Sequence, residues 1–155
     1  MNPEMLIEEL KNRKLTISSA ESMTGGRIAS LITSVAGSSA VFEQGFITYS
    51  NESKVKLLSV KKETIDQFSV ISQEVALEMV EGLIKKTKCD IGISITGLAG
   101  PSSDEIGHEV GLCFIGVGYL GNYEVFSKVL KGHRNEIQDE AAHAAIALAY
   151  HMITR

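Results

Sequence analysis

Residues 20–26 read Ala-Glu-Ser-Met-Thr-Gly-Gly, a small polar turn that ends in two glycines and separates two hydrophobic segments. The segment before it, residues 15–19, is short and β-branched, which predicts a strand. After the turn, Ile28, Leu31 and Ile32 recur at helical spacing and predict an amphipathic helix. Ser22 therefore lies on a strand-to-helix turn, and this unit indicates an α/β fold.

The flanking segments extend this pattern in both directions. A helix is expected to open at Pro3, which suits a first helical position, and Ser72 suits the N-cap of a helix over residues 72–86. Further strands are predicted at 42–49, 90–96, 111–119 and 123–129, the last two as a hairpin, and a final helix at 135–153. Because β-α units occur with a hairpin, a mixed sheet between helical layers is expected.

The composition is that of a globular protein. The chain has 155 residues, of which 44% are hydrophobic and 22% charged, with only two prolines. This length suits one hydrophobic core, and no internal repeat or linker interrupts it. We therefore expect a single domain over residues 1–155.

Charge and cysteine usage exclude several classes of function. The formal net charge is −4 and no basic stripe could follow a phosphate backbone, so nucleic-acid binding by charge is not expected. Cys89 and Cys113 show neither a disulfide framework nor the spacing of a zinc site, so we expect no metal. The longest apolar stretches are too short to span a bilayer, so we expect no membrane association and a cytoplasmic location.

Three predicted strand ends lead into polar or glycine-rich turns, at residues 20–26, 48–54 and 96–101. In α/β sheets, ligands bind beyond the carboxyl ends of the strands, so these turns are expected to line one pocket. The alternative is that they are only tight connections.

Ser22 could act as a nucleophile only with a base beside it. The histidines do not offer one, because His108, His133, His143 and His151 lie outside the turns of the first half and match no catalytic histidine motif. Lys54 could serve if burial removed about three units from its pKa. Spacing alone favours a solvated lysine paired with Glu52 or Glu63.

The start of the helix after residue 26 offers a second feature. Thr24, Gly25 and Gly26 would present backbone N–H groups and the positive end of the helix dipole to an anion, such as a phosphate or a developing oxyanion. The pattern matches neither a Walker motif nor a dinucleotide fingerprint, so ATP and dinucleotides are not indicated.

Four blocks, in this order and spacing, resemble the CinA C-terminal domain family, also called PncC: residues 20–26, Gly37-Ser38-Ser39, residues 45–54 and residues 96–101. The resemblance extends from about residue 8 to residue 153. It implies a three-layer α/β/α sandwich with a mixed sheet and an amidohydrolase without metal or organic cofactor. The implied substrate is the pyridine nucleotide nicotinamide mononucleotide, which would yield nicotinic acid mononucleotide and ammonia. Longer members carry a preceding molybdopterin-binding-like domain, so this chain is expected to be the stand-alone form.

The resemblance also implies roles for individual residues. Ser22 would be the nucleophile, Lys54 its general base, and Tyr49 a hydroxyl that orients Lys54 or carries its proton. Ser39 is a competing nucleophile. The expected substrate-binding residues are Thr24, Gly25, Gly26, Ser38, Ser39, Thr96, Gly97, Gly100 and Arg134. Arg134 would contact the phosphate, although a surface arginine fits that position almost as well.

The chain departs from the family pattern at several positions. Met23 replaces a cysteine, His133 an aspartate and Gln138 an arginine, and the loop at 102–109 lacks the family's glycines and lysine. A more acidic rim would weaken the binding of a phosphorylated substrate. Two rival hypotheses therefore stay open: a catalytically silent member, of the competence- or damage-inducible type, that binds a nucleotide or a protein, and a serine hydrolase of another small amide. A homo-oligomer also stays open.

Overall fold

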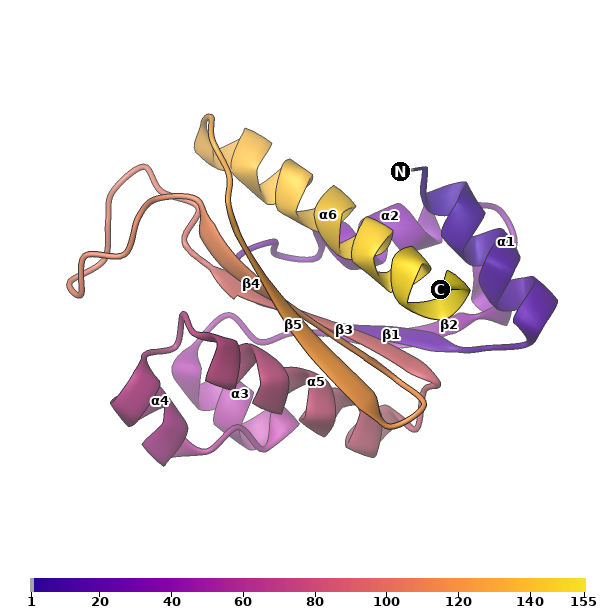
Figure 1. Ribbon diagram of the computed structural model, residues 1–155, viewed down its shortest axis with the longest axis horizontal. Coiled ribbons are helices and arrows are strands. Elements are labelled where there is room, and N and C mark those ends of the chain that lie inside the picture. The colour runs from indigo at the N-terminus through magenta and orange to yellow at the C-terminus, as the bar shows by residue number, and fades with distance from the viewer. Residues whose placement is uncertain (1) are drawn as a thin grey trace.

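The computed structural model describes residues 2–155 and places a five-stranded sheet between two layers of helices (Figure 1). The sheet has the order β2-β1-β3-β4-β5. Its strands are β1 (Ile17–Glu21), β2 (Phe42–Ile47), β3 (Ile91–Gly97), β4 (Leu112–Tyr119) and β5 (Asn122–Val129). Strand β1 pairs in parallel with β2 and β3, whereas β3, β4 and β5 pair antiparallel. The expected mixed sheet of a three-layer sandwich is thus confirmed.

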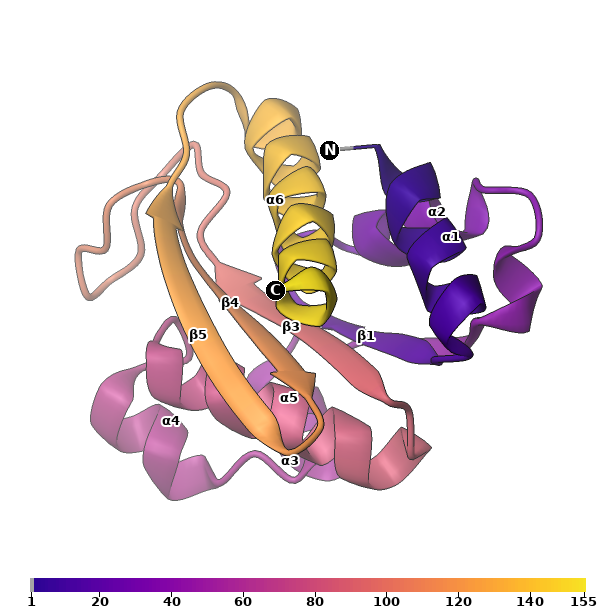
Figure 2. The ribbon, with the colours of Figure 1, turned by 45° about the vertical axis from the view of Figure 1, so that its right-hand side comes forward.

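The helices divide between the two faces of the sheet (Figures 1 and 2). One face is covered by α1 (Pro3–Arg13), α2 (Arg27–Thr33) and α6 (Arg134–Thr154), and the other by α3 (Asn51–Leu58), α4 (Lys62–Phe68) and α5 (Gln73–Thr87). A short 3-10 helix, η1 (Ser38–Ala40), precedes β2. Buried alanines of α6, such as Ala141 and Ala145, carry little bulk and let this long helix pack closely on β3 and β4.

Side chains that cap the helices explain several of the boundaries. Asn2 accepts a hydrogen bond from Glu4 N and begins α1, with Pro3 at its first position. Ser72 accepts one from Val75 N and begins α5, as predicted. The buried residues of α5 include Val75, Met79 and Leu83, so this face belongs to the core.

The region around Lys54 differs from the expectation. The strand predicted at 42–49 ends at Ile47, α3 begins within the turn predicted at 48–54, and α4 lies in a stretch for which no element was predicted. Ser50 and Ser53 cap each other's backbone N–H groups and thereby begin α3, so Lys54 lies within a helix. Both helices have at most eight residues, too few for a clear hydrophobic periodicity.

Within residues 2–155, none of the helices combines the length and the apolar character needed to cross a membrane.

Candidate active site

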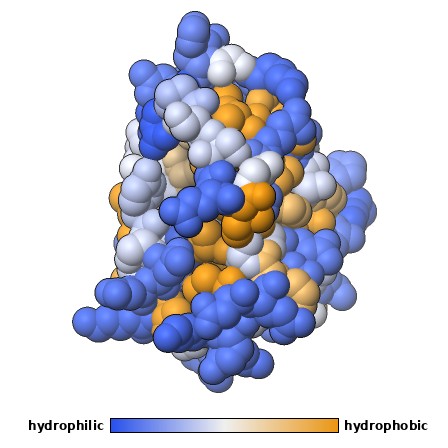
Figure 3. All heavy atoms as spheres, turned by 90° about the vertical axis from the view of Figure 1, so that its left-hand side faces the viewer, coloured by the Kyte–Doolittle hydropathy of each residue, from blue (hydrophilic) through white to orange (hydrophobic). Residues whose placement is uncertain are grey.

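The carboxyl ends of the parallel strands β1, β2 and β3 meet at one edge of the sheet, and a pocket of about 240 Å³ lies there. The three turns predicted to meet do so. The lining residues are Ser22, Met23, Tyr49, Asn51, Lys54, Val70, Ile71, Thr96, Gly97, Leu98, Ala99 and Arg134. Figure 3 shows the side of the molecule that carries the β3–β4 loop, where apolar residues gather between hydrophilic margins.

Ser22 and Lys54 are in direct contact in this pocket. Lys54 Nζ lies 2.9 Å from Ser22 Oγ, and the lysine side chain is 1% exposed. Burial lowers the pKa of Lys54 from an ordinary 10.5 to about 8, because the protein interior disfavours the charged amine. The alternative of a solvated Lys54 is therefore wrong, and at mildly alkaline pH a substantial fraction of the amine is neutral.

The backbone carbonyl of Thr48 orients the amine of Lys54. It lies 2.6 Å from Lys54 Nζ and accepts a hydrogen bond from it, and Thr48 N in turn donates to Glu21 O on β1. With one N–H directed to this carbonyl, the lone pair of a neutral amine can face the Ser22 hydroxyl. A backbone carbonyl occurs at every residue, so no side-chain motif could have indicated this role.

Tyr49 lines the pocket but does not orient Lys54 through a hydrogen bond, while its expected role in carrying the proton stays a prediction. Its side chain is 61% exposed, and its hydroxyl accepts a hydrogen bond of 3.0 Å from Arg134 Nη2. The carbonyl of Thr48 reaches Lys54, whereas the exposed side chain of the next residue, Tyr49, lies at the pocket mouth. The structure thus places Thr48, and not Tyr49, against Lys54.

The start of α2 is already occupied by a carboxylate of the protein itself. Glu21 is buried and accepts hydrogen bonds from Thr24 Oγ1 at 2.6 Å and from the backbone N–H groups of Gly26, Ile28 and Ala29 at 3.2, 2.9 and 2.9 Å. The anion expected at Thr24–Gly26 is therefore Glu21. Gly25 and Gly26 have φ values of 58° and 106°, in the region that favours glycine, so their role in the structure is to form the turn.

Ser38 and Ser39 lie away from Lys54. They belong to η1, which comes just before Phe42, and Phe42 pairs with Ile17 at the start of β1. The pocket lies at the carboxyl ends of the strands, whereas η1 lies beside their amino ends. The length of the strands therefore separates η1 from the pocket. Of the two candidate nucleophiles, the structure brings Ser22 to Lys54 and does not bring Ser39.

The turn after β3 forms a wall of the pocket. Thr96 Oγ1 donates to Val70 O at 2.9 Å and so holds the loop before α5 against β3. Gly97 is needed for close packing, since a Cβ there would come within 2.3 Å of Met23 Sδ. Thr96 and Gly97 line the pocket, whereas Gly100 contributes its carbonyl, which accepts a hydrogen bond from Arg134 Nη1 at 2.5 Å.

Arg134 begins α6 and joins two walls of the pocket at its mouth, through Gly100 O and the Tyr49 hydroxyl. Arg134 is an exposed residue at a helix start, as the alternative of a surface arginine states, and these two hydrogen bonds hold its side chain at the pocket. Its contact with a phosphate stays a prediction. One turn later on α6, Gln138 donates from Nε2 to Met23 O at 2.8 Å. Gln138 thus supports the turn that carries Ser22. The sequence had shown this residue only as a departure from the family pattern and had not indicated that role.

Two acidic residues of the loop at 102–109 have partners in the structure. Asp104 pairs with His108, whose hydrogen bond lowers the pKa of the Asp104 carboxyl, and Glu109 pairs with Lys131 at 2.9 Å. The charged residues that line the pocket itself are Lys54 and Arg134. No acidic residue of the loop, all of which the structure describes, lines the pocket, and the expected weaker binding of a phosphorylated substrate stays a prediction.

Comparisons with known proteins identify the family of this chain. The family model described as the CinA C-terminal domain matches residues 2–153. A CinA-like protein of Kosmotoga olearia is 48% identical over 92% of the chain, and a putative competence-damage inducible protein of Caldicellulosiruptor saccharolyticus is 45% identical over 92%. In both cases the chain spans 35% of the length of the curated relative.

Solved structures show the same fold. The competence damage-inducible protein A of Klebsiella pneumoniae superposes with a TM-score of 0.95 at 27% identity, covering 100% of this chain and 99% of that one. A competence/damage inducible protein of Agrobacterium tumefaciens superposes with a TM-score of 0.93 at 31% identity, covering 99% and 97%. On the family model, the relatives and the shared fold, this chain belongs to the CinA C-terminal domain family.

Proposed function

We propose that the protein hydrolyses the amide of nicotinamide mononucleotide to nicotinic acid mononucleotide and ammonia, with Ser22 as nucleophile and Lys54 as general base. The observation that carries the proposal is the 2.9 Å contact between Lys54 Nζ and Ser22 Oγ, made by a lysine whose burial lowers its pKa to about 8. A base with a pKa near the working pH is suited to proton transfer from a serine hydroxyl.

The bonds made and broken on the protein involve only the Ser22 hydroxyl and the Lys54 amine, with water as the second nucleophile. Ser22 Oγ attacks the carbonyl carbon of the amide while Lys54 takes the hydroxyl proton. The tetrahedral intermediate then expels the nitrogen as ammonia, and Lys54 supplies the proton it had taken. Water attacks the resulting ester with Lys54 again as base, and the carboxylate product leaves with Ser22 regenerated.

The turn that carries Ser22 also offers donors for the oxyanion of the intermediate. The Thr24 hydroxyl and Gly26 N–H are bound to Glu21. Across residues 2–155, the backbone N–H groups of Met23 and Thr24 have no hydrogen-bond acceptor. These two groups, next to the nucleophile in the chain, are therefore the ones we assign to the oxyanion.

The lining of the pocket suits the nicotinamide end of the substrate. Val70, Ile71, Leu98 and Ala99 offer an apolar wall for a flat ring, and Ser22 lies beside it. A volume of about 240 Å³ is below the ~300–1,000 Å³ of sites that enclose a whole drug-sized ligand, so the phosphate would extend toward the mouth. Arg134 lies there, and a guanidinium binds a phosphate with a forked pair of hydrogen bonds.

The test is an ammonia-release assay on nicotinamide mononucleotide with the wild type, Ser22→Ala and Ser39→Ala. The loss of a catalytic nucleophile should lower kcat by roughly three orders of magnitude or more, whereas Ser39→Ala should keep wild-type activity because η1 lies across the sheet. The reverse result would transfer the role of nucleophile to Ser39.

Two other outcomes would favour the rival hypotheses. Binding of nicotinamide mononucleotide without turnover would favour a catalytically silent member of the family. Turnover of another small amide in its place, with the same dependence on Ser22, would retain the serine–lysine mechanism and change the substrate.

A further inference from the structure

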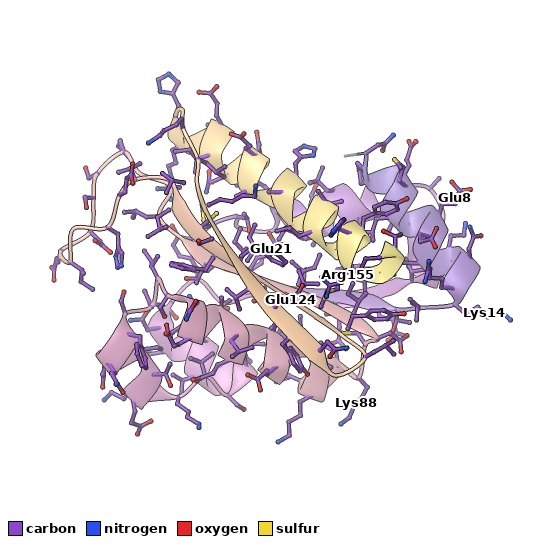
Figure 4. The ribbon with its side chains drawn as sticks, in the orientation of Figure 1. Glu8, Lys14, Glu21, Lys88, Glu124 and Arg155 are labelled. Carbon is purple, nitrogen blue, oxygen red and sulfur yellow. The ribbon has the colours of Figure 1, made fainter. Side chains whose placement is uncertain are left out.

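Glu21 is the buried charged residue that the proposed mechanism does not use. Its side chain lies inside the molecule, between the sheet and the helices α2 and α6 (Figure 4), and the residue is 1% exposed. It does not line the pocket, and the part of the chain that the structure describes offers it no ion pair. Burial of a carboxylate costs free energy unless hydrogen bonds replace those to water, and four donors do so here. The presence of a charged group at this buried position therefore requires an explanation.

The backbone of Glu21 is fixed by the sheet. It is the last residue of β1, its carbonyl accepts from Thr48 N at 2.8 Å, and it is aligned with Ile47 on β2 and Ile95 on β3. The next residue is also bound to the sheet, because Ser22 N donates to Ile95 O at 3.1 Å. Glu21 thus stands where the rigid sheet ends and the catalytic turn begins.

The side chain of Glu21 holds the far end of the same turn. Its two carboxylate oxygens accept from Thr24 Oγ1 and from backbone N–H groups at Gly26, Ile28 and Ala29. Residues 22–26 are therefore closed into a loop whose start is fixed by the sheet and whose end is fixed by the carboxylate. Charged hydrogen bonds of this kind are stronger than neutral ones, so the loop has little freedom to move Ser22.

The negative charge of Glu21 is compensated at the start of α2 and does not act on the base. Backbone N–H groups and the helix dipole favour an anion at this position. Burial alone lowers the pKa of Lys54, with no contribution from a neighbouring carboxylate. A change at Glu21 should therefore alter the position of Ser22 and leave the ionisation of Lys54 unchanged.

We propose that Glu21 is a positioning residue that holds the Ser22 hydroxyl in line with Lys54, an inference that rests on the proposed serine–lysine mechanism. In Glu21→Gln the amide keeps one acceptor oxygen and turns an NH₂ group toward at least one of the four donors. The hydrogen bonds that close the turn can then no longer all form. A misplacement of about 1 Å can cost roughly 100-fold in rate, so we expect kcat to fall about 10- to 100-fold.

Two features would distinguish positioning from a general loss of structure. KM and the pH midpoint of kcat/KM should stay at their wild-type values. The matched control is Glu78→Gln, because Glu78 also caps a helix start, accepting from Lys61 N at 2.8 Å and Thr64 Oγ1 at 2.6 Å, but does so at α4. Glu78→Gln should keep kcat within about twofold of the wild type, since α4 does not carry Ser22.

A readout without substrate separates this proposal from the proposed function. A fluorophosphonate probe forms an Oγ–P bond with an activated serine and releases fluoride, and peptide mass spectrometry locates the label. We expect the probe to label Ser22 in the wild type, at an unchanged rate in Glu78→Gln and about 10-fold or more slowly in Glu21→Gln. This result would support the positioning role even if nicotinamide mononucleotide is not the substrate. An equal labelling rate in the wild type and Glu21→Gln would overturn it.

If the probe does not label Ser22 in any variant, that result counts against the proposed function alone. Hydrogen exchange then tests the positioning role of Glu21. The amides of Gly26, Ile28 and Ala29 should exchange faster in Glu21→Gln, while β3 and α5 keep their protection. Unchanged exchange at these three amides would overturn the proposal. If Glu21→Gln fails to fold, Thr24→Val removes one donor without touching the carboxylate. It should slow labelling of Ser22 about 3- to 10-fold, and an unchanged rate would again overturn the proposal.

Discussion

Replacement of Lys54 by methionine should make the protein inactive and, at neutral pH, more stable. Burial lowers the pKa of Lys54 from 10.5 in the unfolded chain to about 8 in the folded protein. Below pH 8 the folded protein must carry a buried ammonium, and the difference between the two pKa values corresponds to about 3 kcal/mol in the free energy of unfolding. Methionine is of similar length and removes this cost.

A smaller term opposes the gain. Without Lys54, the carbonyl of Thr48 loses the donor at 2.6 Å, and an unsatisfied buried acceptor costs about 1–2 kcal/mol. At pH 7 we therefore expect Lys54→Met to be more stable than the wild type by about 1–2 kcal/mol.

The sign of the pH dependence follows from proton binding. Between pH 8 and 10.5 the unfolded chain holds a proton on Lys54 that the folded protein has released, so wild-type stability gains from this residue as pH rises. Above pH 10.5 neither state is charged at Lys54, and the variant should be the less stable of the two because only the lost hydrogen bonds remain.

Urea unfolding of both proteins from pH 6.5 to 10.5 measures this directly. The difference between the two curves isolates Lys54, because other titrating groups, such as the Cys113 thiol whose pKa burial raises to about 11, contribute equally to both proteins. A variant less stable than the wild type at pH 7, or a stability difference that does not change with pH, would refute the conclusion that Lys54 is a desolvated base.

Three further outcomes are expected. The kcat/KM of the wild type should rise with pH through a midpoint near 8. Lys54→Arg should be nearly as inactive as Lys54→Met, because a guanidinium cannot release its proton at usable pH. A nearly active Lys54→Arg enzyme would rule out the serine–lysine mechanism. Arg134→Ala should raise KM for nicotinamide mononucleotide about 10-fold more than for the riboside, which has no phosphate, and equal losses on both would show that Arg134 only joins Gly100 to Tyr49. Gln138→Leu should lower kcat about 10-fold because the carbonyl of Met23 loses its donor, while the exposed neighbour Glu140→Gln serves as control, and equal activity of the two variants would show that Met23 is held by other contacts.

Much of the fold could be predicted because local pattern and burial agree along most of the chain. Residues 90–96 are almost wholly apolar or small and became the central strand β3, and Ser72 began α5 as expected. Helices α3 and α4 were not predicted, because they are too short for their apolar spacing to stand out. Helices of this length depend on packing, not on their own propensity.

The sequence by itself determined which side chains could do the chemistry and which predicted strand ends would deliver them, because the residues of a turn and of the strand before it are local properties of the chain. Only the tertiary structure decided that Lys54 is buried against Ser22, that the carbonyl of Thr48 and not the hydroxyl of Tyr49 orients it, and that Ser39 lies across the sheet. Desolvation and hydrogen bonding depend on atoms brought together from distant parts of the chain. The pKa of a lysine is therefore set by the packing around it, and spacing in the sequence contains no record of that.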